Sequence, residues 1–427
     1  MTQKRVLTGI TTTGTPHLGN YLGAIKPAVR ASQDASLSSY FFLADFHALI
    51  KCHDPERVAR STREIAATWL ALGLDTDNAT FYRQSDIPEI PELTWILTCL
   101  CSKGLMNRSH AYKASVDANR DAGNQDLDDG VTMGLFSYPV LMAADILMFN
   151  AKHIPVGKDQ IQHIEMARDI AGRFNHTFAD LFVMPEPMID DPVIIPGLDG
   201  RKMSKSYDNT IPLFCSEKEL LSLIKQIKTD SRLPGEPKDA DSSTLFELYS
   251  LFASDQETAE FRSKFEQGIG WGDAKLELFE SLNGYLREPR KRYNELMQDL
   301  NSVEVLLNKG AEKAREYSVP FMREIREATG IRPLNTTLVG AAKSAPKKKE
   351  KSAEQLANAE AGRRRGILMQ LKSELNYVAN ARETAPEAAK QVIAQKREEI
   401  AGLKKKAKIK AENELEILLE ELAQYLV

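Results

Sequence analysis

The sequence predicts an α/β protein whose N-terminal half forms a doubly wound parallel sheet, followed by an all-α region and a helical C-terminal extension. Short β-favouring runs alternate with stretches of helical spacing as far as Pro212. Helical spacing then continues almost unbroken to residue 334. The segment 335–352 is rich in lysine and small residues, which is typical of a linker. We therefore expect domains at residues 1–212 and 213–334, a linker at 335–352 and a helical hairpin at 353–427.

Size and composition indicate an ordinary soluble protein. The 427 residues are enough for two or three domains with a sizeable core, and the net charge is −4. No apolar run is long enough to span a bilayer, and the N-terminus lacks the apolar region of a signal peptide. The four cysteines form no ligand-spaced cluster, so no metal site is expected. These features predict a cytoplasmic protein with no membrane partner.

The first strand and helix have an arrangement that binds phosphate. Residues Arg5–Ile10 predict a short buried strand, Thr11–Gly14 a turn, and the residues after His17 the start of a helix. A strand, a glycine-containing turn and a helix N-terminus together present free backbone N–H groups to an anion. The pattern alone is not specific, because a single histidine is usually structural.

Further strands and helices follow in alternation. The run Ser39–Ile50 predicts a buried strand that ends in Asp45 and His47. This polar pair therefore lies at the carboxyl end of the strand, where open α/β sheets bind ligands. A helix cap and a core histidine are the alternative interpretation. Residues 57–72 predict a helix, 79–84 a strand and 92–105 a helix, whereas 106–129 is polar with few apolar anchors.

A single carboxylate lies in the most apolar predicted helix. That helix covers residues 131–149, and Asp145 is its only charged side chain. A buried carboxylate is costly unless it has a partner, so Asp145 is expected to be paired. Residues 152–160 then predict a strand, a glycine turn and the start of a helix. In the all-α region, helices are expected near residues 217–227, 245–253, 255–267, 273–300 and 303–329.

A compact basic motif follows the glycine-containing turn at 196–200. Lys202 and Lys205 stand three residues apart, with hydroxyl groups beside them at Ser204 and Ser206. Lysine is a mobile point charge with three donors, which suits phosphates whose charge shifts during a reaction. The turn before the motif lets such a loop approach and retreat. An exposed basic loop is the alternative interpretation.

Together, the two motifs resemble those of the class I aminoacyl-tRNA synthetases. Residues 202–206 match the KMSKS signature letter for letter, and 17–20 resemble the HIGH signature with asparagine in its last position. The resemblance covers about Arg5 to Arg332. It is closest to the bacterial tryptophan enzymes, on the runs 19–21, 45–47, 138–147 and 155–160. It implies a Rossmann-like catalytic domain, a helical anticodon-binding domain and a homodimer.

The resemblance also implies a reaction and its residues. The reaction is the attachment of L-tryptophan to tRNA(Trp) through a tryptophanyl adenylate, with ATP and Mg²⁺ as cofactors. The catalytic residues implied are Lys202, Lys205 and His17. Those implied for ATP binding are Thr11, Thr12, Thr13, Gly19, Asn20, Gly157, Lys158, Asp159, Val193, Lys202, Met203, Ser204, Lys205 and Ser206. Those implied for tryptophan binding are Asp145, Tyr138, Met142, Gln160, His47, Gly9, Ile154 and Val156.

The same likeness gives individual roles within the tryptophan site. Asp145 would accept a hydrogen bond from the indole N–H, while Tyr138 and Gln160 would hold the ammonium group. Met142, Ile154 and Val156 would line the ring pocket. In the nucleotide site, Gly157 and Asp159 would meet the ribose, and the backbone near Val193 would meet the adenine.

The chain departs from the family pattern in three places. Threonines stand at 11–13 where Gln-Pro-Ser is frequent, Leu7 stands where phenylalanine is frequent, and Lys158 stands where an acidic residue is usual. The first two changes put details of the pocket in doubt but leave the reaction class intact. The residues after Gly340 lie outside the resemblance. They carry 18 Lys and Arg against 13 Asp and Glu, and either contact a nucleic-acid backbone or form a solvated appendage.

Three other functions remain open at this point. A tyrosyl-tRNA synthetase shares the fold and motifs, but the apolar helix around Asp145 argues against it. A small-molecule nucleotidylyltransferase has a similar first loop, but no helical domain like residues 217–334. A relative that binds tRNA or an amino acid as a regulator needs no catalytic lysines, and the presence of Lys202 and Lys205 argues against it.

Overall fold

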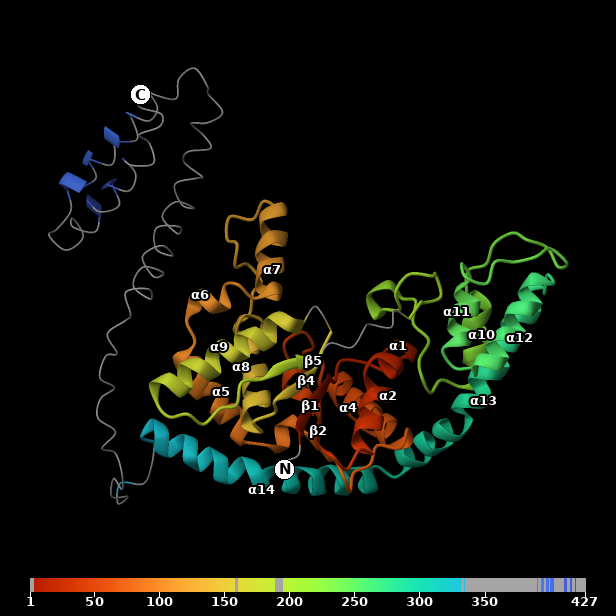
Figure 1. Ribbon diagram of the computed structural model, residues 1–427, viewed down its shortest axis with the longest axis horizontal. Helices are drawn as coiled ribbons and strands as arrows, with labels where there is room; N and C mark the ends of the chain where they lie inside the picture. The colour runs from red at the N-terminus through yellow and green to blue at the C-terminus, as the bar shows by residue number, and fades with distance from the viewer. Residues whose placement is uncertain are drawn as a thin grey trace. The chain divides into compact units, whose positions relative to one another are not determined.

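The computed structural model describes residues 4–157, 160–188 and 195–331, Leu334, and scattered positions between 390 and 419. Within these residues the predicted parallel sheet has five strands in the order β3-β2-β1-β4-β5 (Figure 1). The strands are β1 (Lys4–Thr11), β2 (Leu37–Ala44), β3 (Thr80–Arg83), β4 (His153–Pro155) and β5 (Glu186–Met188). All the pairings are parallel, so the predicted fold class is confirmed.

The strand order reverses beside β1. From β1 the chain moves outward to β2 and β3, then crosses to the other side of β1 to add β4 and β5. Such a switch point opens a crevice at the carboxyl ends of the strands, because the connections on its two sides leave in opposite directions. The first phosphate-type loop leaves β1 at this point.

Helices cover both faces of the sheet, and the alternation of side chains along β2 explains why. Phe41 and Leu43 belong to one apolar core, whereas Tyr40 and Phe42 point to the other face and belong to a second core. Both faces are buried, as expected for a parallel sheet.

The helices of the sheet region lie close to where the sequence predicts them. Helical residues follow β1 without a break from Leu18 to Ser32, as α1 (Leu18–Asn20), a π-helical turn (Tyr21–Ile25) and α2 (Lys26–Ser32). The others are α3 (Asp45–Ala48), α4 (Pro55–Ala71), α5 (Glu89–Leu100), α6 (Lys103–Met106), α7 (His110–Asp121), α8 (Met133–Met148) and α9 (Ile161–Thr177). Helix α7 lies in the polar stretch for which no element is predicted, and none of its residues is buried.

The all-α region also has the predicted helices. They are α10 (Glu217–Gln226), α11 (Thr244–Ser250), α12 (Asp255–Glu266), α13 (Trp271–Gln298) and α14 (Leu300–Thr329). None of the described helices is long and apolar enough to cross a membrane.

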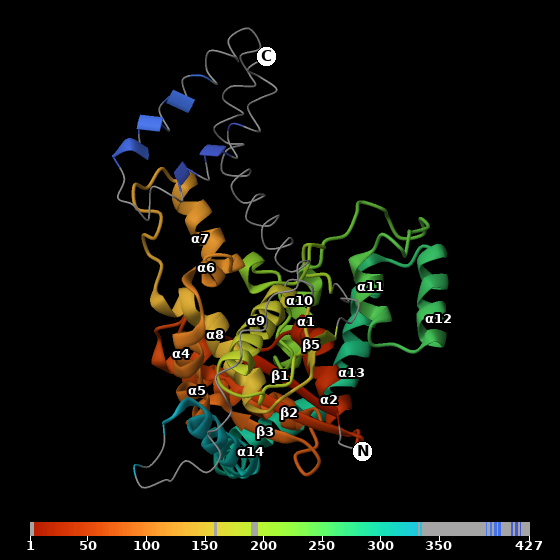
Figure 2. The ribbon, with the colours of Figure 1, turned by 60° about the vertical axis from the view of Figure 1, so that its left-hand side comes forward.

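Helix α14 returns to the sheet and packs along β3, as the views in Figure 1 and Figure 2 show. Gly310 makes this approach possible, because a Cβ there would lie 1.7 Å from the carbonyl oxygen of Phe81. Arg83 of β3 forms a two-pronged ion pair with Glu304 of α14, at 2.6 and 2.9 Å. Residues 1–334 accordingly form one compact unit, and the domain boundary at 212 stays a prediction.

Residues 335–427 form a second unit, which is described by itself. Ile393 and Ile400 are buried, and most of the described positions around them are helical. The predicted linker and most of the predicted hairpin lie outside the described residues.

Candidate active site

The loop after β1 is closed by a reciprocal cap at the start of α1. The His17 Nδ1 atom accepts a hydrogen bond from the Asn20 N–H at 3.4 Å, and the Asn20 side-chain oxygen accepts one from the His17 N–H at 3.2 Å. Burial, and then the charge of Lys205, lower the pKa of His17 to about 4. His17 is therefore neutral near pH 7, and its ring hydrogen lies on Nε2.

The basic motif is held in place by Asn209. The Ser204 N–H donates to the Asn209 side-chain oxygen at 2.8 Å, and the Asn209 amide donates to Asp199 at 2.7 Å. Gly197 allows this packing, because a Cβ there would lie 2.3 Å from the Asn209 side chain. Met203 is buried and its N–H donates to the Ile195 carbonyl at 2.8 Å. The lysines thus project from a loop whose backbone is held by these hydrogen bonds.

A pocket of about 650 Å³ separates the two motifs, and we call it the phosphate pocket. The predicted residues that line it are Thr11, Thr13, His17, Gly19, Asn20, Lys202, Met203, Ser204 and Lys205. Lining residues that sequence reasoning missed are Ile10, Gly14, Pro16, Ile65, Ile195 and Tyr207. The volume is ample for a nucleotide, since ligand pockets typically measure about 300–1,000 Å³.

Six other predicted nucleotide residues lie elsewhere or outside the described residues. Thr12 is fully buried and does not line the pocket. Neither Gly157 nor Ser206 lines it; the Ser206 N–H instead donates to the Ser204 hydroxyl at 3.3 Å. Lys158, Asp159 and Val193 lie outside the described residues.

Lys205 also has a lowered pKa in the phosphate pocket. Burial and then the charge of Arg57 lower its pKa, while Glu64 opposes the shift. A Cβ at Gly14 would lie 2.8 Å from its amine, so the lysine rests against the glycine of the first loop. The two predicted motifs therefore meet in space.

Asp145 has the partners that its burial demands. It is 1% exposed in α8, and one oxygen accepts from His47 Nε2 at 2.9 Å while the other accepts from Gln84 at 2.7 Å. Burial raises the pKa of Asp145, and the bonds to His47 and Gln84 oppose that rise. A carboxylate has about four lone-pair sites, so two remain for a ligand donor.

Asp45 and His47 differ in which interpretation of the sequence they fit, a structural role or a ligand site. Asp45 has a structural place, because it accepts from the Ser85 N–H at 3.1 Å and from the Ser85 hydroxyl. His47 instead points to Asp145. Sequence reasoning missed Gln84 as a site residue. The only signal for it is its position as the last residue of the strand predicted at 79–84.

A second polar chain involves Tyr138 and Gln160. The Tyr138 hydroxyl lies 2.7 Å from His163 Nε2, and His163 Nδ1 lies 2.9 Å from the Gln160 side-chain oxygen. Because that oxygen accepts from Nδ1, Nε2 accepts from the tyrosine. The rings of His47 and Tyr138 are 6.5 Å apart, edge to face, so the two chains adjoin. We call these four side chains, together with Asp145 and Gln84, the buried polar cluster.

The predicted ring-pocket residues lie in the second apolar core. Ile154 is buried, and Met142 and Val156 pack against the same core. Gly9 of β1 faces Phe42, whose ring would be 2.4 Å from a Cβ at that position. Gly9 therefore has a packing role whether or not a ligand reaches it.

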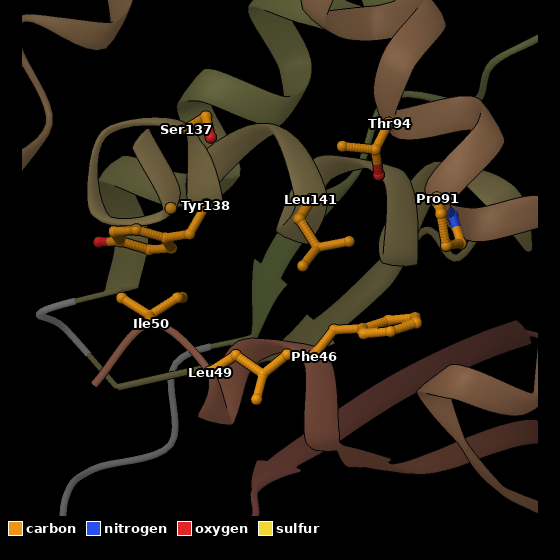
Figure 3. Close-up of a pocket in the computed structure, with 9 residues that line it drawn as sticks. Phe46, Leu49, Ile50, Pro91, Thr94, Ser137, Tyr138 and Leu141 are labelled. Atoms are coloured by element: carbon orange, nitrogen blue, oxygen red, sulfur yellow. The ribbon is translucent and has the colours of Figure 1, made fainter. Parts of the chain in front are cut away.

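A separate apolar pocket of about 330 Å³ opens beside the cluster (Figure 3). Of the predicted tryptophan residues only Tyr138 lines it. Its other walls come from the segment after β2 and from α5 and α8, with lining residues Phe46, Leu49, Ile50, Pro91, Thr94, Gly134, Ser137 and Leu141. In Figure 3 Leu141 reaches from α8 toward Phe46.

Comparisons with known proteins agree with this geometry. The family described as tRNA synthetases class I (W and Y) matches residues 2–287. A tryptophan–tRNA ligase of Pseudomonas putida is 61% identical over 353 residues, which cover 82% of this chain and 78% of that protein. One from Neisseria meningitidis serogroup A is 58% identical over 335 residues, covering 78% of this chain and 100% of that protein.

A solved structure is also similar. It is the tryptophanyl-tRNA synthetase of Campylobacter jejuni, crystallised with ADP and tryptophan, and it is 40% identical with a TM-score of 0.71. The match covers 76% of this chain and 99% of that one.

Proposed function

The chain belongs to the class I tRNA synthetase family of the tryptophan and tyrosine enzymes, and we propose that it attaches L-tryptophan to tRNA(Trp) through a tryptophanyl adenylate. The observation that carries the choice of amino acid is the buried Asp145, held by His47 and Gln84 with two acceptor sites to spare. An unpaired buried acceptor costs about 1–3 kcal/mol, so an aromatic ring without an N–H donor is disfavoured. Relatives named as tryptophan–tRNA ligases support the same choice.

In the first step the tryptophan carboxylate attacks the α-phosphorus of ATP. The bond from that phosphorus to the bridging oxygen breaks, and pyrophosphate leaves with the electron pair. The attacking carboxylate is already ionised, so the step needs no general base. Positioning and charge stabilisation must supply the acceleration. Neutral His17 offers an N–H donor to the phosphates, and Lys202 and Lys205 follow the charge that moves onto pyrophosphate.

We expect Mg²⁺ to accompany the nucleotide. Among the described residues no group of three or more His, Cys, Asp or Glu side chains is placed to hold a metal. Mg²⁺ in nucleotide sites is commonly bound by phosphate oxygens and water, and it neutralises part of the phosphate charge. The lysines and His17 do the positioning that belongs to the protein.

In the second step the 2′-hydroxyl of the terminal tRNA ribose attacks the carbonyl carbon of the adenylate, and AMP leaves. The helical region from residue 213 to 334 is the proposed anticodon-binding part. We place the reaction in the cytoplasm.

A homodimer is supported by exposed apolar side chains around the pocket of Figure 3. Leu49 lines that pocket and is 52% exposed, while Trp95 and Met133, which adjoin lining residues in sequence, are 69% and 73% exposed. Monomeric proteins rarely expose such a patch, and a second copy of the chain would cover it.

The direct test is ATP–pyrophosphate exchange, measured separately with each of the twenty amino acids. We expect exchange with tryptophan alone. Exchange with tyrosine would overturn the role of Asp145 but keep the mechanism. No exchange with any amino acid would leave a binding protein on a synthetase scaffold.

A further inference from the structure

Helix α4 lies beside the first loop and holds it from one side. Arg57 and Glu64 are seven residues apart, which is about two helical turns, so both face the same way. The Arg57 Nε and Nη2 atoms both donate to the Thr13 carbonyl oxygen, at 3.1 and 3.0 Å. Glu64 accepts from the Thr15 hydroxyl at 2.7 Å. The two side chains thus anchor the loop on both sides of Gly14.

The geometry of the peptide bond after Thr13 relates the anchored carbonyl to the direction of the Gly14 N–H. In a trans peptide the carbonyl of one residue and the N–H of the next point in opposite directions. Arg57 therefore turns the Gly14 N–H away from α4. Thr13 and Gly14 line the phosphate pocket, whereas Arg57 is not among its lining residues.

The Gly14 N–H is also available. No hydrogen bond from it is found among the described residues, whereas the neighbouring Thr13 N–H donates to the Thr11 carbonyl at 3.0 Å. An unpaired N–H on a glycine, beside the amine of Lys205, is a suitable donor for an oxygen of a polyphosphate.

We propose that Arg57 is a positioning residue for adenylate formation: by fixing the Thr13 carbonyl it presents the Gly14 N–H to the phosphates of ATP, next to Lys205. This inference rests on the proposed function and names a residue outside the motifs that define it. Arg57 itself makes no contact with the reacting atoms. Its charge also acts on Lys205, whose pKa it lowers.

The test compares Arg57→Met with Arg60→Met. Both variants remove one positive charge from α4, but Arg60 only approaches Glu64, at 4.0 Å, and its side chain is 64% exposed. We expect Arg57→Met to lower kcat for pyrophosphate exchange roughly 10- to 100-fold, somewhat less than direct loss of a transition-state donor. The KM for tryptophan should not change, and Arg60→Met should match the wild type. Arg57→Lys keeps a charge and a donor, and should recover part of the rate.

A second readout separates positioning from loss of structure. In a single turnover, preformed tryptophanyl adenylate is transferred to tRNA without the phosphates, so Arg57→Met should transfer at the wild-type rate. Equal losses in both steps, or equal losses in Arg60→Met, would overturn the proposal, as would unchanged exchange. Binding of inorganic tripolyphosphate, measured by calorimetry, should weaken in Arg57→Met. That measurement stays informative if the wild type shows no exchange, which would count against the proposed function alone.

Discussion

The phosphate pocket and the buried polar cluster lie at the same edge of the sheet but are built in opposite ways. The pocket lies between two loops, is lined by lysines and backbone, and opens to solvent. The cluster lies between elements of the core, and Asp145, Gln84 and His163 are all nearly inaccessible. In the proposed reaction, one region would handle charge that moves during the reaction, and the other would bind a substrate group that does not change.

This difference shows why a loop suits the phosphates and a buried site suits the choice of amino acid. A loop can follow a phosphate as charge migrates, because lysine side chains are flexible. A buried acceptor can reject a wrong substrate, because leaving it unpaired is costly in a low-dielectric site. If the two regions are independent in this way, changes in one should leave the constants of the other intact.

The largest expected effect comes from Lys205→Ala, which tests the phosphate side. Removing a positive charge that stabilises the transition state more than the ground state should lower kcat for adenylate formation about 100- to 1,000-fold. Tryptophan affinity, measured by calorimetry without ATP, should change little because Lys205 is not in the cluster. Lys205→Arg serves as the control that keeps the charge. Equal losses in rate and in tryptophan affinity would contradict the transition-state role.

The next effect comes from Asp145→Asn, which tests the other side. Both oxygens of Asp145 accept hydrogen bonds, so one amide N–H of asparagine would face the His47 or Gln84 donor. The mismatch should cost about 1–3 kcal/mol, which is on the order of 10- to 100-fold in kcat/KM for tryptophan.

The KM for ATP is the matched readout for the same variant, and it should stay within about twofold. A loss of about 1.4 kcal/mol in ATP binding would already raise it tenfold. Asp45→Asn is the control, because Asp45 bonds Ser85 rather than the cluster. A parallel rise in the KM for ATP would show that the two regions are coupled.

The sequence predicts the parts of both regions better than their connections. The strands, the two motifs and the buried Asp145 all follow from local patterns, since apolar periodicity and turn residues are short-range signals. The contacts of Gln84 with Asp145 and of Arg57 with Thr13 join residues 61 and 44 positions apart. No local pattern encodes such a pairing, because it depends on how strands and helices stack.

The helical region shows the same limit. Each of its helices is predicted from its own spacing, but the return of α14 to β3 is not. One trace of that packing is Gly310, a poor helix former in the interior of α14, where the carbonyl of Phe81 leaves no room for a side chain. Thr12 is a further case, since the family likeness assigns it to ATP while its side chain is fully buried.

Gly310→Ala tests whether a change far from both regions affects the buried polar cluster and leaves the phosphate pocket unchanged. The added methyl would meet the β3 backbone, and overpacking of this kind costs typically about 1–3 kcal/mol in the free energy of unfolding. β3 leads directly into Gln84, so the KM for tryptophan should rise while the KM for ATP stays unchanged. Urea unfolding and exchange kinetics measure both effects. Gly284→Ala in α13 is the control: nothing lies within 4 Å of its added Cβ, so it should be neutral or slightly stabilising.

The smallest expected effect concerns pH and tests whether the phosphate side depends on a neutral His17. Burial lowers the pKa of His17 from 6.5 to about 4, so between these values the unfolded chain binds a proton that the folded chain does not. His17 therefore contributes its full stability above pH 6.5, and this is lost as the pH falls toward 4. Allowing for solvent screening, the loss should be about 1 kcal/mol. His17→Asn keeps a helix cap and removes the titration, so its unfolding free energy should fall less over this range. An equal decline in both proteins would place the titrating group elsewhere and leave the protonation state of His17 in the pocket unconstrained.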